Sequence, residues 1–227
     1  MQDNETVGSA EGRYVQLKTE REPFLYRGRK CAELTLPFLL PEEGTSGGTQ
    51  FQTPYQSLGA RGVVHLASKL LMALLPPNAP FFRLTVDDFD VRKLAGEAQR
   101  GKMEEGLSSI ERAVMTRIET AAIRVPCFAA LKQLIVTGNC LLNVNKAEGT
   151  IRVFKMDSYT VSRDGLGHLL EIITHEKISP LLLPQAVQEL LAQREQDKQE
   201  VTKNLNLYTH IKLVGGRWEL YQEVKGI

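Results

Sequence analysis

The chain has 227 residues, enough for one large domain or two small ones. Its 28 Lys and Arg residues nearly balance its 27 Asp and Glu residues, so it lacks the basic excess of a dedicated nucleic-acid-binding protein. The apolar run LLMALL is too short to span a bilayer, and the N-terminal residues show no secretory signal, so no membrane partner is expected. Three cysteines without a CxxC pair fit a reducing environment rather than a disulfide framework.

The first part of the chain has a helical pattern. Residues 11–36 are expected to form a helix that Pro23 breaks or kinks near Glu22, because proline removes a backbone donor and clashes with the preceding turn. Residues 41–50, PEEGTSGGTQ, have the composition of a polar, glycine-rich loop.

The next segment contains the best-defined helix of the sequence. Thr53 and Gln56 have the spacing of a capping box, and Pro54 suits the first helical position. Pro76 and Pro77 forbid continuation, so a helix of about twenty residues is predicted.

This helix is apolar over an arc of roughly 200°, about twice what a surface helix needs. Leu70 lies at the centre of the arc and Leu74 lies one turn further on, whereas Arg61, His65 and Lys69 form a narrow basic stripe. The helix is therefore expected to be covered on at least two sides. Two explanations stay open: it is the central helix of a monomeric core, or part of its arc meets another subunit.

Helices continue after a short strand. FFRLTV, residues 81–86, reads as a strand, and the acidic run at 87–90 is expected to cap a short helix through Leu94. Apolar residues spaced by three and four predict a long helix over 103–125. Pro126 then opens another helix, which Gly138 is expected to end.

The hydrophobic period changes at residue 139. Turns at KAEG, GLG and GG separate alternating runs, which predicts three β-hairpins with one helix at 184–194. The fold class is therefore α+β, mainly helical over 1–138 and mainly β-hairpins over 139–227, within a single region. The end of the chain just after a strand suggests a truncated C-terminus.

Candidate chemistry is sparse. Residues 96–102 fit the G-x-x-x-x-G-K pattern of a nucleotide-binding loop, but Met103 stands where the magnesium-binding hydroxyl is needed, so a helix–loop–helix turn is favoured. Asp87, Asp88 and Asp90 lack the spacing of a calcium loop and are better explained as a helix cap. No histidine pair has zinc spacing and no catalytic elbow is present. No catalytic residue, cofactor or metal site is therefore expected, and the protein is not expected to be an enzyme.

The sequence resembles one known family over most of residues 10–225. TPYQSLGARGVVHLASKLLMALLP is similar to the signature of the head-to-tail connectors, or portal proteins, of short-tailed bacteriophages. Further similar fragments are EGLSSIERAVMTRIE, FAALKQLIVTGNCLL, SRDGLGHLLEIITHEKI and LYTHIKL. The signature positions are occupied by Thr53, Pro54, Tyr55, Gln56, Gly59, Ala60, Arg61, Gly62, Leu66, Ala67, Ser68, Lys69, Leu70 and Pro76.

The resemblance implies a portal wing-like fold and a structural function. It implies a homo-oligomeric ring, a dodecamer, at a capsid vertex of the virion, assembled in the host cytoplasm. Implied partners are the capsid protein, the terminase, tail adaptor proteins and double-stranded DNA, which passes through the channel with weak contacts. In that setting Arg61, His65, Lys69, Leu70 and Leu74 mark a packing or interface helix. The alternatives are a DNA-binding module that uses the basic stripe and a degenerate nucleotide-binding protein.

Overall fold

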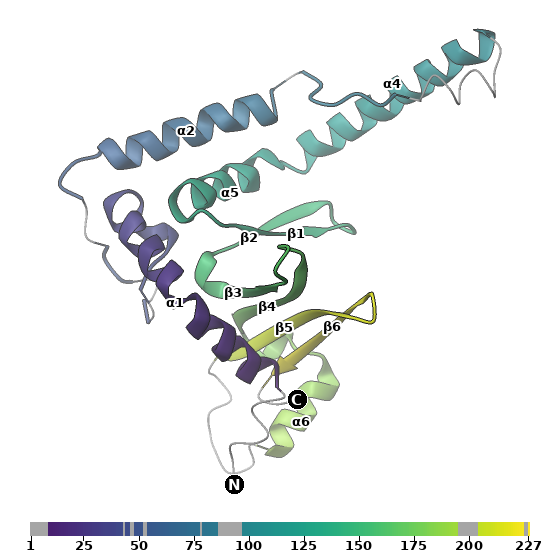
Figure 1. Ribbon diagram of the computed structural model, residues 1–227. Coiled ribbons are helices and arrows are strands. Elements are labelled where there is room, and N and C mark those ends of the chain that lie inside the picture. Colours follow the sequence, from purple (N-terminus) through teal and green to yellow (C-terminus); the bar gives the residue numbers. More distant parts are fainter. Residues whose placement is uncertain are drawn as a thin grey trace. The chain divides into compact units, whose positions relative to one another are not determined.

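A computed structural model describes residues 9–42, 44–45, 48–51, 54–77, 79–85, 97–194, 204–224 and 227. It confirms the α+β class, with helices early in the chain and antiparallel strands from residue 141 onward (Figure 1). By its internal contacts the chain forms two units. The first combines Met1–Arg27 with Lys155–Ile227, and the second is Gly28–Phe154.

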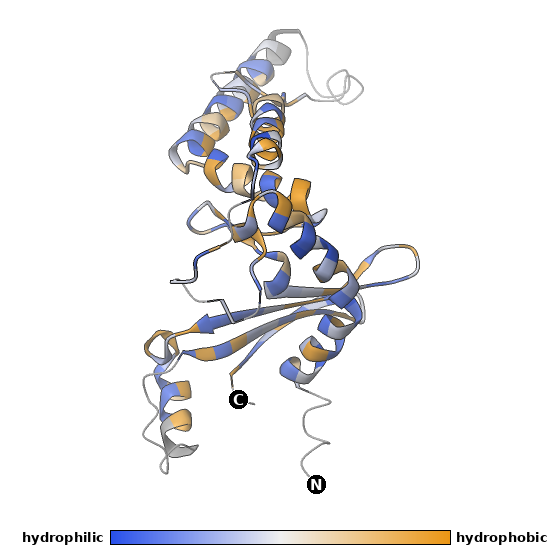
Figure 2. Ribbon diagram, turned by 90° about the vertical axis from the view of Figure 1, so that its left-hand side faces the viewer, coloured by the Kyte–Doolittle hydropathy of each residue, from blue (hydrophilic) through white to orange (hydrophobic). Residues whose placement is uncertain are grey.

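The first unit is built on a four-stranded antiparallel sheet of order β3-β4-β5-β6. Its strands are β3 (Tyr159–Arg163), β4 (Leu169–Ile178), β5 (Leu205–Val214) and β6 (Arg217–Val224). The two hairpins predicted separately for this region thus share one sheet. Both hydrophobic and hydrophilic residues occur along the strands (Figure 2). In β5, Leu205, Leu207, Ile211 and Leu213 lie an even number of residues apart, so they share one face of the sheet.

A helix packs on each face of this sheet. The start of α1 (Ala10–Leu34) buries Tyr14 and Leu17 against Ile173 and Tyr208. On the opposite face, a cluster of Leu183, Leu191, Leu205 and Val224 anchors α6 (Gln185–Arg194) at one end of the sheet.

Of the predicted break or kink at Pro23, the break is wrong, because α1 runs through Pro23 as one helix. Proline deletes one backbone hydrogen bond, but buried side chains hold the helix on both sides of it. Leu17 precedes Pro23 and is 6% exposed, and Leu25 follows it and is 1% exposed. Burial on both sides therefore outweighs the local preference.

The second unit contains α2 (Leu58–Leu74), α4 (Glu97–Thr120), α5 (Arg124–Thr137) and the hairpin of β1 (Leu141–Asn145) and β2 (Thr150–Phe154). Helix α2 packs on α5, and α5 packs on β2. Gly138 ends α5 as predicted, with a left-handed φ of 71° and its N–H 2.9 Å from the Leu134 carbonyl oxygen.

The predicted start of α2 is wrong by one turn. Pro54 and Gln56 precede the helix, whose first turn closes where the Arg61 N–H donates to the Ser57 carbonyl at 2.9 Å. The expected cap, Thr53, lies outside the described residues. The predicted stop is confirmed, since Leu75 is the last residue whose N–H joins the helical ladder before Pro76.

Two further boundaries differ from expectation. Residues 81–85 are not a strand, because the Leu84 N–H donates to the Glu111 carboxylate at 2.6 Å instead of to a strand neighbour. The long helix ends at Thr120, where Ala122 adopts a positive φ of 50° before α5 begins. The acidic run at 87–90 and the short helix to Leu94 lie outside the described residues.

Candidate interface surface

Helix α2 buries only a narrow part of its apolar arc. Val63 and Ala67 are buried, whereas Leu66, Leu70 and Leu74 are 46%, 36% and 57% exposed. Of the two explanations, a central helix of a monomeric core is therefore wrong, because Leu70 is not buried by the part of the chain that the structure describes. The hydrophobic pattern identified the face correctly but did not reveal what covers it. We call Leu66, Leu70 and Leu74 the α2 ridge.

Both ends of α2 are fixed from within the second unit. At the start, a Cβ placed on Gly59 would lie only 2.6 Å from the Leu34 carbonyl oxygen, so glycine permits a close approach of helix and backbone. At the end, the Arg124 guanidinium donates to the carbonyl oxygens of Leu75 and Pro76 at 3.2 and 2.9 Å. A cation at a helix C-terminus also interacts favourably with the helix dipole. The ridge is thus presented by a firmly positioned helix.

The basic stripe lies on an exposed side of the same helix. Arg61, His65 and Lys69 are all exposed, and Arg61 and His65 line a shallow depression together with Ala60, Val64 and Ser68. None of the three forms an ion pair with any described residue. The sequence from Gly44 to Val86 contains no Asp or Glu, so α2 itself carries only basic charged side chains.

The nucleotide-binding pattern at residues 96–102 does not form a loop. Glu97 to Lys102 belong to the first turns of α4, so they cannot wrap around a phosphate, and the expected helix–loop–helix turn is equally wrong. Gly96 lies outside the described residues, as do Asp87, Asp88 and Asp90. Among the residues that the structure describes, no cluster of three or more His, Cys, Asp or Glu could hold a metal ion.

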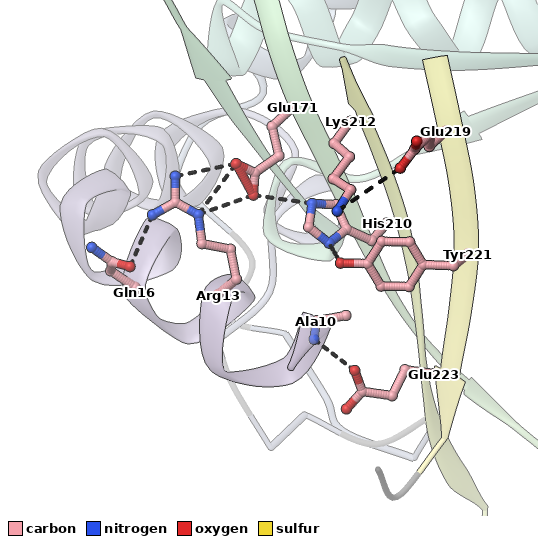
Figure 3. A network of polar contacts seen from close by, with 9 residues as sticks. All are labelled: Ala10, Arg13, Gln16, Glu171, His210, Lys212, Glu219, Tyr221 and Glu223. Atoms are coloured by element: carbon pink, nitrogen blue, oxygen red, sulfur yellow. Dashed lines mark hydrogen bonds and ion pairs between the residues drawn. The ribbon is translucent and has the colours of Figure 1, made fainter. Parts of the chain in front are cut away.

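A network of polar contacts joins α1 to the sheet of the first unit (Figure 3), and the sequence did not predict it. Arg13 of α1 binds the Glu171 carboxylate with its Nε at 3.0 Å from Oε1 and its Nη2 at 3.1 Å from Oε2. His210 Nε2 lies 3.1 Å from the same Oε1, and the Tyr221 hydroxyl is hydrogen-bonded to His210 Nδ1. At the helix N-terminus, the Ala10 N–H donates to the Glu223 carboxylate at 2.6 Å. The network therefore attaches α1 to three strands of the sheet.

The electrostatics indicate a neutral imidazole in this network. Burial lowers the pKa of His210, and the Glu171 carboxylate opposes this only in part. The neutral ring can accept the Tyr221 O–H at Nδ1, whereas Nε2 lies close to Glu171 without forming a hydrogen bond to it. Arg13 already binds both oxygens of the Glu171 carboxylate. These side chains therefore hold α1 on the sheet and do not form an acid–base pair.

No sequence motif could have revealed this network, because Arg13 and Glu171 are 158 residues apart. Only the alternation of side chains along the strands could have indicated it, because it places His210 and Tyr221 at positions that face the core rather than solvent. Register places Ile173, His210 and Tyr221 side by side across β4, β5 and β6.

No single helix among those that the structure describes is long and apolar enough to span a bilayer. Residues 101–120 and 124–137 meet the length and composition test only together, and they are bent by 73° at the break between them.

Comparison with known proteins identifies the family. Residues 7–226 match the family described as bacteriophage head to tail connecting protein, and the chain belongs to this family. It is 36% identical over 221 residues to the portal protein of Escherichia phage T7, covering 94% of this chain and 41% of that protein. It is 35% identical over 237 residues to the portal protein of Enterobacteria phage T3, covering 100% of this chain and 44% of that protein. The portal protein of Enterobacteria phage SP6 is 29% identical over 217 residues, or 94% of this chain and 42% of that protein.

The resemblance seen in the sequence is therefore confirmed. The chain spans less than half the length of these relatives. The comparisons favour neither a DNA-binding module nor a nucleotide-binding protein.

Proposed function

We propose that this chain is part of a phage portal, a closed homo-oligomeric ring, expected to be a dodecamer, at the vertex that joins head and tail. Capsid protein, terminase and tail adaptor proteins bind this ring, and double-stranded DNA passes through it during packaging and ejection. The protein acts in the virion and assembles in the host cytoplasm, and its function is architectural rather than enzymatic. Family membership supports this proposal.

The observation that carries the self-association is the α2 ridge. A single chain leaves Leu66, Leu70 and Leu74 partly in water, although burying a large aliphatic side chain contributes about 1.5–3 kcal/mol. We infer that the ridge is buried against a neighbouring copy in the ring. Arg61, His65 and Lys69 then lie at the rim of that contact, where charges typically remain solvated.

Polar substitutions on α2 test this proposal. In the complete gene product, Leu66→Gln together with Leu74→Gln is expected to weaken or abolish rings, because glutamine keeps helix propensity but removes the apolar contact. Met72→Gln is the matched control, since Met72 is 62% exposed and lies on the opposite side of α2 from the ridge. Mass photometry and negative-stain microscopy measure the oligomeric state.

Two results would contradict the proposal. Rings of normal abundance from the double variant would show that the ridge is not an interface. A wild-type gene product that stays monomeric at all concentrations would contradict ring formation itself.

A further inference from the structure

The first unit carries an exposed apolar turn beside α6. Leu181 and Leu182 are 84% and 77% exposed within η4 (Pro180–Leu182). The turn is held in shape, because the Leu181 N–H donates to the Ser179 hydroxyl and Gln188 Nε2 donates to the Leu183 carbonyl at 2.7 Å. Prolines on either side of the leucines further restrict the backbone. We call Leu181 and Leu182 the knob.

A second apolar surface lies on the face of the sheet that carries α6. Trp218 pairs with Leu213, and Leu220 pairs with Ile211, so Leu213, Trp218 and Leu220 share one face. They are 38%, 51% and 63% exposed. We call these three residues the patch.

Knob and patch lie at opposite ends of the same sheet. The knob follows Ile178, which pairs with Leu205 at the start of β5, whereas the patch adjoins the turn after Val214. The ten residues of β5 separate these ends by roughly 30 Å at about 3.4 Å per residue. Helix α6 covers the sheet beside the knob, through Leu205 and Val224, and leaves the patch in water.

The knob and the patch are two different apolar surfaces at a fixed distance on one protomer, which is what head-to-tail association between copies requires. In a closed ring every protomer offers one surface to the copy ahead and another to the copy behind. Both surfaces are then used by one kind of partner, a second copy of this chain. We propose that the knob of one protomer binds the patch of the next copy of this chain. This inference rests on the proposed ring and adds a second contact to that of the α2 ridge.

The sizes of the surfaces agree with such a supplementary contact. Each exposes apolar area on the order of a few hundred Å², the size at which patches on monomers are often functional. A standard interface buries roughly 800 Å² per partner. Knob and patch therefore supply part of a ring contact, and the α2 ridge supplies another part.

Cysteine cross-linking tests the assignment in the complete gene product. Its native cysteines, which include Cys31, Cys127 and Cys140, are first replaced by serine. Leu181→Cys and Leu220→Cys proteins are then assembled together and treated with a short bifunctional thiol reagent. Cross-linked dimers are expected from the mixture and not from either variant alone. Glu219→Cys replaces Leu220→Cys as the matched control, because Glu219 is the neighbouring residue on the other face of β6.

The possible cross-linking results distinguish failure of the knob and patch contact from failure of the proposed ring. Rings in which the mixture cross-links no better than the Glu219→Cys control would overturn the knob and patch contact but leave the ring proposal standing. Cross-linking of Leu220→Cys with itself would indicate a two-fold contact and would also overturn the inference. Absence of rings from the wild-type protein would contradict the proposed function, and the inference with it.

Discussion

Two glycines of α2 should respond to the same substitution with opposite signs. Gly59 and Gly62 are three residues apart in one helix, and neither has the positive φ that would itself require glycine. A Cβ on Gly59 would lie 2.6 Å from the Leu34 carbonyl oxygen and 3.2 Å from Thr35 Cγ2. A Cβ on Gly62 would meet nothing within 4 Å. The largest difference between the two positions is what a new methyl group would meet, so alanine at each position compares the effect of packing.

The expected magnitudes follow from this geometry. Gly62→Ala should stabilise the chain by about 0.5–1 kcal/mol, because alanine loses less backbone entropy in a helix than glycine does. At Gly59 the new methyl group meets a backbone atom, which cannot rotate away as a flexible side chain would. Forcing an extra carbon into such a site typically costs about 1–3 kcal/mol, which exceeds the small gain in helix propensity near a helix start. The two variants should therefore differ by about 1.5–4 kcal/mol.

Urea denaturation followed by far-UV circular dichroism measures this difference, since the signal reports on helical structure, to which α2, α4 and α5 of the second unit contribute. Gly59→Ala should lower the urea midpoint and Gly62→Ala should raise it, with similar dependence on urea concentration. If both variants are stabilised by the same amount, α2 does not approach Leu34 closely and the account of the helix start is wrong.

Two further predictions concern the buried tyrosine and the basic stripe. Burial and the nearby Glu11 raise the pKa of Tyr208 to about 12, above its ordinary 10.0, so the folded state holds this proton more tightly and the stability it contributes is lost as pH rises from about 10 to 12. Tyr208→Phe, which also removes the bond to Glu11, should therefore destabilise the chain less at high pH than near neutrality; a difference in unfolding free energy that does not change with pH would contradict this. For DNA, Arg61, His65 and Lys69 allow two or three phosphate contacts, which implies a log–log salt slope of about −2 to −3 and dissociation constants no tighter than roughly 10⁻⁴ M at physiological salt. Micromolar duplex binding with a steep slope, abolished by Arg61→Ala with Lys69→Ala, would favour a DNA-binding module instead.

The elements that were predictable depend on local signals. Gly138 ends its helix because a left-handed residue is needed there, and the KAEG turn joins the strands of its hairpin because turn residues and alternation agree. These signals depend on only a few neighbouring residues, so they do not change with the packing of the rest of the chain.

The errors arose where distant parts of the chain decide. Pro23 predicted a break, but burial on both sides of it keeps α1 continuous. Residues 81–85 have strand-like composition but bind a carboxylate of α4. The apolar arc around Leu70 is real, yet periodicity cannot distinguish a face covered within the chain from one left for a partner. The candidate interface was thus located by sequence, while its exposure required the structure.

The assembly of the first unit from both ends of the chain has a consequence for biosynthesis. The Tyr208 hydroxyl and the Glu11 carboxylate that it binds at 3.1 Å are 197 residues apart. At roughly 5–20 residues per second, the start of α1 emerges from the ribosome about 10–40 s before the strand it packs against. All of the second unit is synthesised within that interval and can fold first. The apolar face of α1 with Tyr14 and Leu17 must wait unpaired meanwhile, so chaperone binding to the nascent chain should be concentrated there until β5 and β6 are complete.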